Sequence, residues 1–204
     1  MVSDSDRSTF LCLVVFLALS AAARSARADD TFAFAPTEPS NHRAAFADVD
    51  HRWTFEVLGT GLGDVTNRHL VMGGTTVGVG YYVLNNLAID MDFTGYGFNE
   101  GAVSGEAVGW TLGLRHHLLN FGSTSLFVDV SGGLIEASHV MPYGGTHFND
   151  TFEVGPGVAI PLADNMYFTG GVRYFHLSNG NRSGPDRNPS VNAVQGVVGL
   201  MWRF

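Results

Sequence analysis

The sequence predicts an all-β fold, namely an eight-stranded antiparallel transmembrane β-barrel. Eight successive segments alternate between apolar and polar or small residues, and turn-forming clusters separate these segments. The chain also ends in Phe204 directly after an alternating segment, which is typical of outer-membrane barrels.

The N-terminal 50 residues do not share this alternation. An apolar run at residues 10–23 precedes Ala26-Arg27-Ala28, a pattern typical of a secretory signal peptide. The run is too short for a membrane-spanning helix, which needs about 20 residues. Cleavage would also remove Cys12, the single cysteine of the chain. The predicted parts are a signal peptide at residues 1–28, an irregular segment at residues 29–50 and the barrel at residues 51–204.

The alternating segments have the side-chain period of a β-strand. They cover residues 52–57, 71–81, 87–94, 108–115, 126–134, 151–160, 166–174 and 194–204. The clusters between them read GDVTNRH, LNN, NEGAVSG, LNFGST, MPYGG, PLADN and NGNRSGPDRNP. Such clusters of glycine, proline, asparagine, aspartate and serine favour turns, so each strand should pair with the next.

Each segment opposes an apolar face to a polar one. The apolar faces carry, in chain order, Trp53, Phe55 and Val57; Val71, Val77, Val79 and Tyr81; Leu87, Ile89, Met91 and Phe93; Val108, Trp110, Leu112 and Leu114; Leu126, Val128, Val130 and Leu134; Phe152, Val154, Val158 and Ile160; Met166, Phe168, Val172 and Tyr174; and Val194, Val198, Leu200, Trp202 and Phe204. The opposite faces carry Arg52, Thr54 and Glu56; Gly74, Thr76, Gly78 and Gly80; Asp90, Asp92 and Thr94; Thr111, Gly113 and Arg115; Asp129 and Ser131; Thr151 and Glu153; Thr169 and Arg173; and Gln195 and Arg203.

The polar faces indicate a membrane barrel. They combine charges of both signs with many glycines and threonines, as expected for a narrow lumen in which acids and bases pair. The apolar faces would then meet lipid, where only a closed sheet leaves no backbone group unsatisfied. A soluble, lipocalin-like barrel is the alternative fold. The residues expected to pair in the lumen are Glu56, Asp90, Asp92, Arg115, Asp129, Glu153 and Arg173.

Charge and histidine spacing exclude several kinds of partner. The net charge of -8 argues against a nucleic-acid partner, which would require a basic surface. The histidines do not have the spacing of a metal site, so we predict neither a metal nor another cofactor. We interpret His116, His117, His139 and His147 as surface or loop residues.

The sequence HLSN, residues 176–179, lies just beyond the seventh alternating segment, near the outer end of the same strand. With both termini on the periplasmic side, this end of the strand lies at the cell surface, and parity places His176 and Ser178 on the lipid-facing side. A neutral imidazole can take the proton of a serine hydroxyl and make it a nucleophile. Asn179 could donate its amide to a developing oxyanion. Polar residues at a strand end are also common at the level of lipid headgroups, so a purely structural role is the alternative.

Residues 176–204, HLSNGNRSGPDRNPSVNAVQGVVGLMWRF, resemble the C-terminal signature of the PagL family of outer-membrane lipid A 3-O-deacylases. The resemblance covers this stretch and the eight-stranded architecture. It implies a serine esterase that hydrolyses the ester-linked acyl chain at the 3 position of lipid A, with Ser178 as nucleophile and His176 as base. It further implies that the partner is lipopolysaccharide of the bacterial outer membrane. A homodimer is a further possible assembly.

The third catalytic residue departs from the family pattern. The acidic position of the family falls on Asn192, and an amide can orient a histidine but cannot stabilise an imidazolium by charge. Asp150 is a second candidate for the acid, because a hairpin centred near Ala163 places it opposite His176. A slip of two residues would place Phe152 there instead. The competing function is a non-enzymatic structural or adhesive barrel in which HLSN is a remnant.

Overall fold

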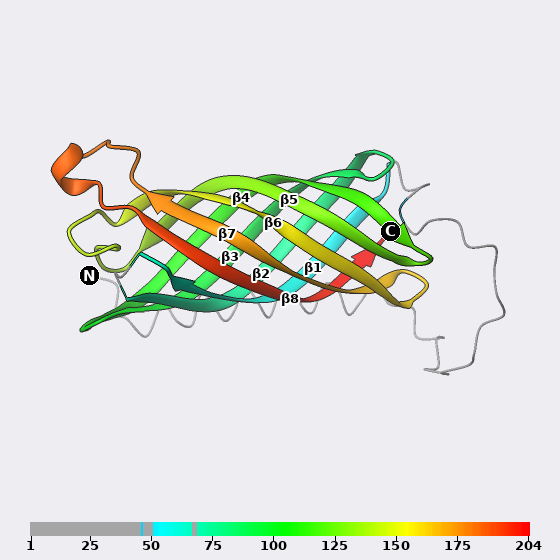
Figure 1. The fold of residues 1–204 in the computed structure, drawn as a ribbon, viewed down its shortest axis with the longest axis horizontal. Coiled ribbons are helices and arrows are strands. Elements are labelled where there is room, and N and C mark those ends of the chain that lie inside the picture. The colour runs from blue at the N-terminus through cyan, green and yellow to red at the C-terminus, as the bar shows by residue number, and fades with distance from the viewer. Residues whose placement is uncertain (1–45, 47–50, 67–68) are drawn as a thin grey trace. The chain divides into compact units, whose positions relative to one another are not determined.

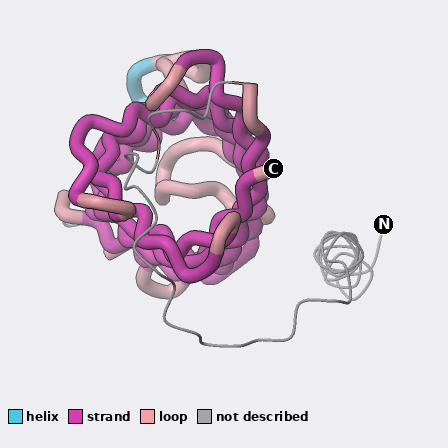
Figure 2. Tube along the Cα trace, turned by 90° about the vertical axis from the view of Figure 1, so that its right-hand side faces the viewer, coloured by secondary structure: helices cyan, strands magenta, loops and turns pink. Residues whose placement is uncertain are grey.

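The computed structural model describes residue 46, residues 51–66 and residues 69–204. Eight antiparallel strands form a closed barrel in which β1 pairs with β8, so the predicted fold class is confirmed (Figure 1). Viewed from one end, the strands form a closed ring (Figure 2). The strands are β1 (Trp53–Asp64), β2 (Leu70–Leu84), β3 (Leu87–Glu100), β4 (Val103–Phe121), β5 (Thr124–Ala137), β6 (Phe148–Ala163), β7 (Met166–Ser178) and β8 (Val191–Arg203). The predicted signal peptide lies outside the described residues, as does the irregular segment except for Phe46, and both stay predictions.

The two ends of the barrel differ in the length of their connections. At one end, two-residue turns join β2 to β3, β4 to β5 and β6 to β7. Asn86 and Gly122 have φ angles of 68° and 62°, as tight hairpin turns require. At the other end, residues 138–147 and 179–190 form longer loops, the second with a 3-10 helix at Pro185–Arg187. Because outer-membrane barrels have short periplasmic turns and longer extracellular loops, the long-loop end is extracellular.

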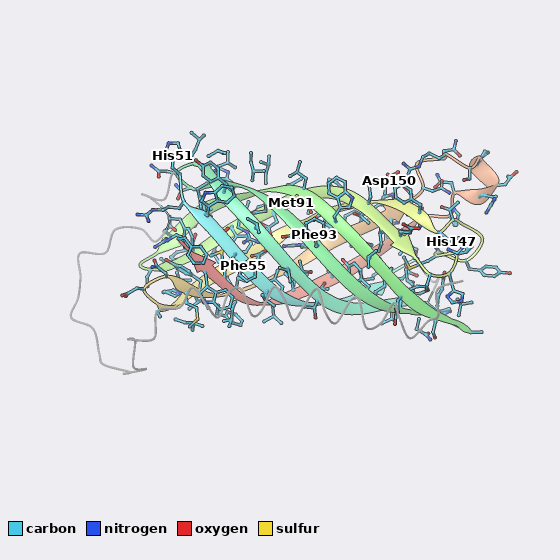
Figure 3. All side chains as sticks on the ribbon, turned by 180° about the vertical axis from the view of Figure 1, so that it is seen from behind. His51, Phe55, Met91, Phe93, His147 and Asp150 are labelled. Atoms are coloured by element: carbon cyan, nitrogen blue, oxygen red, sulfur yellow. The ribbon has the colours of Figure 1, made fainter. Side chains whose placement is uncertain are left out.

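The outer surface of the barrel is apolar, as the alternation predicted. Figure 3 shows Phe55, Met91 and Phe93 along the middle of the barrel. Met91 and Phe93 are 43% and 56% exposed, and Trp110 on β4 is 43% exposed. A continuous apolar surface of this kind needs lipid to cover it. The described part of the chain has no helix long and apolar enough to cross a membrane.

Ion pairs fill the middle of the lumen, as expected from the polar faces. Arg115 places Nη1 2.9 Å from Glu56 Oε2 and Nε 2.8 Å from Asp129 Oδ1. Arg173 places Nη2 2.6 Å from Asp129 Oδ2 and Nη1 3.0 Å from Glu153 Oε2. Asp129 therefore joins the two arginines, and the network ties together strands β1, β4, β5, β6 and β7.

Two of the predicted ion-pair residues are held less tightly. Asp90 Oδ2 is 4.0 Å from Arg115 Nε, at the limit of an ion pair. Asp92 forms no ion pair with the described residues, and its Oδ1 has no hydrogen-bond partner among them. A Cβ atom at Gly78 would lie 2.2 Å from this oxygen, so glycine on β2 makes the space that the buried carboxylate occupies.

Layers of apolar side chains lie on the extracellular side and on the periplasmic side of the ion pairs. The extracellular layer includes Leu62, Phe98, Phe175 and Leu177 among the buried residues of one cluster. The periplasmic layer is a second cluster, which consists of Phe46, Tyr82, Ala88, Phe127, Ala159, Tyr167 and Met201. The lumen is thus a packed core with a charged centre.

One histidine interpretation is wrong. His117 is only 2% exposed and lies in the periplasmic layer, where it hydrogen-bonds Tyr82 and Ser125 at 2.8 Å each. The ring of Phe46 stacks on it with centroids 3.8 Å apart. Odd-numbered residues of β4 face the lumen, so His117 follows Arg115 inward, whereas His139 and His147 are exposed as predicted.

Candidate functional site

His176 and Ser178 lie at the extracellular end of β7 and face outward. Their neighbours Phe175 and Leu177 are fully buried in the lumen, which fixes the opposite direction for the two polar side chains. Both are half-buried, on the same face as the exposed residues Val172 and Tyr174. The predicted placement outside the lumen is confirmed.

Asn192 lies directly opposite His176 in the pairing of β7 with β8, on the outward face that parity predicted. His176 Nδ1 is 2.8 Å from Asn192 Oδ1. An amide oxygen only accepts hydrogen bonds, so Nδ1 carries the proton and donates it in this contact. Nε2 is then the nitrogen whose lone pair can act as a base.

Tyr174 is a site residue that the sequence reasoning assigned only to the apolar face. Its hydroxyl donates to Asn192 Oδ1 over 2.5 Å, so the same oxygen accepts from both Tyr174 and His176. The sequence could have identified Tyr174 as a neighbour of the site, because it precedes His176 by two residues and therefore lies on the same face of the strand.

The predicted register of Asp150 is wrong. Phe152 lies opposite His176, and Asp150 lies opposite Ser178. The hairpin turns at Asp164-Asn165, one residue beyond the expected centre, and the register shifts again between Pro161 and Ala163. The alternative slip of two residues is therefore the one that occurs.

Asp150 pairs with the extracellular loop instead of the histidine. Its Oδ1 is 2.9 Å from Nη2 of Arg182, and the Arg182 guanidinium also lies 5.1 Å from the centroid of the Phe148 ring. Figure 3 shows Asp150 at the end of the barrel opposite His51. The Arg182 side chain thus folds back over β6 beside the strand position of Ser178.

The oxyanion role predicted for the side chain of Asn179 is also wrong. Asn179 is 1% exposed, and its amide nitrogen donates to the carbonyl of Arg187 and to Thr146 Oγ1. Its Oδ1 accepts from the backbone N–H of Asn181 at 3.0 Å. Asn179 lies just beyond the end of β7, and these loop contacts bury its side chain and hold the loop after β7 in place. With Arg187 Nη2 donating to Gly145 O at 3.3 Å, these contacts join the two long loops.

Ser178 and His176 are neighbours on the same face of β7 but do not contact each other through a hydrogen bond. Within the described part of the chain there is no hydrogen bond between His176 and Ser178. Catalytic hydrogen bonds are often long in an enzyme without its substrate and shorten when the substrate binds. No group of three or more metal-binding side chains occurs among the described residues.

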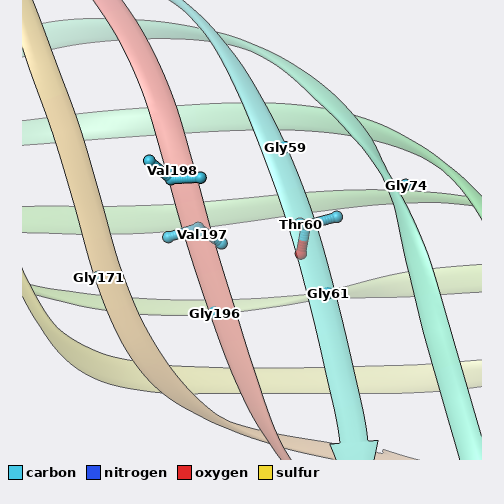
Figure 4. Close-up of a pocket in the computed structure, with 8 residues that line it drawn as sticks. All are labelled: Gly59, Thr60, Gly61, Gly74, Gly171, Gly196, Val197 and Val198. Atoms are coloured by element: carbon cyan, nitrogen blue, oxygen red, sulfur yellow. The ribbon is translucent and has the colours of Figure 1, made fainter.

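A recess on the barrel is lined by other residues (Figure 4). Its walls are five glycines together with Thr60, Val197 and Val198, from strands β1, β2, β7 and β8. Because the lining contains neither a carboxylate nor an imidazole, it offers no acid or base for catalysis, and the outward end of β7 is the candidate site.

No model of a protein family matches the chain, and no curated protein matches it. Among solved structures it is similar to Neisserial surface protein A, with 15% sequence identity over 74% of this chain and 94% of that chain and a TM-score of 0.52. The chain has the fold of an eight-stranded outer-membrane β-barrel. It is also similar to the outer membrane protein OprG from Pseudomonas aeruginosa, with 10% identity over 76% of this chain and 97% of that chain and a TM-score of 0.48. These similarities concern the fold, so the activity must be inferred from the site.

Proposed function

We propose that the protein is a lipid A deacylase that hydrolyses the 3-position ester-linked acyl chain of lipopolysaccharide by a serine esterase mechanism. The observation that carries the proposal is the hydrogen bond of 2.8 Å between His176 and Asn192, on the outward face where Ser178 also lies. An imidazole oriented by a third side chain and placed near a serine is the arrangement that nucleophilic catalysis uses. The resemblance of residues 176–204 to the PagL family supports the same activity.

The location suits a lipid substrate. The site lies at the extracellular end of the barrel and opens toward the membrane, where the outer leaflet holds lipopolysaccharide. Phe152 and Val194, which lie beside His176 and Tyr174 in the sheet, are 43% and 52% exposed. Acyl chains could pack against this apolar surface while the ester stays at headgroup level beside the serine.

The proposed reaction has two steps. The oxygen Oγ of Ser178 attacks the carbonyl carbon of the ester, and its proton passes to Nε2 of His176. When the tetrahedral intermediate collapses, the sugar oxygen leaves and takes this proton, and the acyl group stays on the serine. Water then attacks the acyl-serine, with His176 accepting a proton from water and returning one to Ser178 as the fatty acid leaves.

The second candidate function is a structural or adhesive barrel without enzymatic activity. One observation favours it, namely that an amide stands at the position of the acidic residue in the family pattern. Asn192 orients the imidazole but does not provide the negative charge that stabilises an imidazolium.

Mass spectra of lipid A distinguish the two candidates. Cells would express the parent protein, Ser178→Ala or the control Ser104→Ala, which changes an exposed serine at the extracellular end of β4. Lipid A should lose one hydroxyacyl chain with the parent and with Ser104→Ala, and stay intact with Ser178→Ala. If lipid A is unchanged although all three proteins are folded in the outer membrane, the deacylase proposal is wrong and the structural barrel is favoured.

A further inference from the structure

We propose that Tyr174 is a positioning residue that fixes the orientation of the Asn192 amide and thereby the tautomer of His176. Its effect on catalysis rests on the proposed deacylase function, whereas its effect on the tautomer does not. The hydrogen bonds of 2.5 Å from Tyr174 and 2.8 Å from His176 converge on one atom, Asn192 Oδ1.

The sheet places the three side chains in one row of contacts. His176 pairs directly with Asn192, and Tyr174 pairs with Val194, so Asn192 lies diagonally across from Tyr174. Diagonal neighbours on antiparallel strands lie within reach of aromatic side chains. The phenol therefore reaches the amide from the membrane side while the imidazole contacts it from the neighbouring strand position.

An amide needs such a restraint because its two ends are chemically different. Oδ1 only accepts and Nδ2 only donates. If the amide of Asn192 rotated by half a turn, Nδ2 would face Nδ1 of His176 and would favour the tautomer with the proton on Nε2. In that tautomer Nε2 already carries a proton, so it cannot accept the proton of Ser178. The phenol O–H donates to Oδ1 in the observed orientation, whereas after the rotation its oxygen would have to accept from Nδ2. The phenol disfavours the rotation because a phenol is a better donor than acceptor.

A carboxylate at position 192 would not need this restraint. Both of its oxygens accept hydrogen bonds, so rotation by half a turn leaves an acceptor facing Nδ1. The tyrosine therefore matters because the third residue is an asparagine. This difference separates a positioning role from a general role of Tyr174 as an aromatic residue at the membrane interface, which would be the same with either partner.

Nitrogen NMR of the His176 ring tests the tautomer directly. The refolded protein in detergent micelles would be labelled with 15N in histidine and measured in alkaline buffer, where imidazoles are neutral. The chain has eight histidines, so His176→Gln identifies the signals of His176. The variants are Tyr174→Phe, Asn192→Asp and the double variant, with Tyr143→Phe as control because Tyr143 is 78% exposed in a loop and its hydrogen bond to Glu100 uses the backbone.

The parent protein, Asn192→Asp, the double variant and the control should all show a proton on Nδ1. Tyr174→Phe alone should move a substantial part of the signal to the Nε2–H tautomer. In deacylation assays Tyr174→Phe should lower kcat about tenfold without changing KM, and should have little effect when position 192 is aspartate.

The outcomes separate this inference from the proposed function. If Tyr174→Phe changes the tautomer but no variant deacylates lipid A, the positioning inference stands and the deacylase proposal fails. If the parent deacylates lipid A and Tyr174→Phe leaves both the tautomer and kcat unchanged, the positioning inference is overturned. An equal loss of kcat with asparagine and with aspartate at position 192 would also overturn it, because the role would then be structural.

Discussion

Replacement of Asn192 by aspartate should accelerate deacylation. The amide oxygen is 2.8 Å from His176 Nδ1, so a carboxylate in its place would contact the imidazolium directly. Two opposite unit charges about 4 Å apart attract each other by roughly 4 kcal/mol at an effective dielectric constant of about 20. Because both residues are half-buried, water and ions screen this attraction, and we expect roughly 2 kcal/mol. This corresponds to about a 30-fold increase in kcat.

The assay is release of fatty acid from lipopolysaccharide by refolded protein in mixed micelles. Asn99→Asp is the matched control, since Asn99 is also an outward-facing asparagine near the extracellular end of a strand. The control should keep the kcat of the parent. If Asn192→Asp leaves kcat unchanged or lowers it, while His176→Ala abolishes release, the charge at position 192 does not act through the histidine and the account of the third residue is wrong.

Two further substitutions test the register and the lumen. Asp150→Asn should keep the kcat of the parent, because Asp150 pairs with Arg182 and lies opposite Ser178 instead of His176; a large loss of kcat in the micelle assay would contradict the observed arrangement. Arg115→Met should lower the free energy of unfolding by about 3–5 kcal/mol, because it leaves the buried Glu56 without its ion-pair partner and leaves Asp129 with Arg173 alone. Urea unfolding followed by the gel mobility of the folded barrel measures this loss, and Arg182→Met, which removes an exposed ion pair, should change stability by less than about 1 kcal/mol.

The barrel was predictable because lipid imposes a simple rule on its sequence. Every second residue of a strand must be apolar where it meets the membrane, so parity alone placed Phe93 and Trp110 outside and Asp129 and Arg173 inside. The same rule placed His176, Ser178 and Asn192 on the outward face, and the structure confirms it.

The interior and the loops were harder to predict. The alternation of β4 places His117 on the lumen side, but we predicted a surface position because histidine is polar. Its hydrogen bonds to Tyr82 and Ser125 are seen only in the packed structure. Asn179 follows the strand, where its direction depends on the loop contacts to Thr146 and Arg187.

Register was the weakest inference because it depends on turn geometry. Moving the hairpin centre from Ala163 to Asp164-Asn165, together with the irregularity near Pro161, shifted the pairing by two residues and exchanged Asp150 for Phe152 opposite His176. When the pairing of two strands shifts by an even number of residues, each side chain stays on the same face of the sheet but lies opposite a different residue. The predicted face of Asp150 is therefore right and its predicted partner is wrong.

The reactivity of the Ser178 hydroxyl distinguishes a serine activated by His176 from an inert one. A fluorophosphonate probe labels serine hydroxyl groups that a base has activated, and peptide mass spectrometry locates the modified residue. We expect labelling of Ser178 in the folded parent protein, no labelling at that residue in His176→Ala, and faster labelling in Asn192→Asp. Absence of label on Ser178 in the parent, or equal labelling with and without the imidazole, would contradict an activated serine at the lipid-facing end of β7.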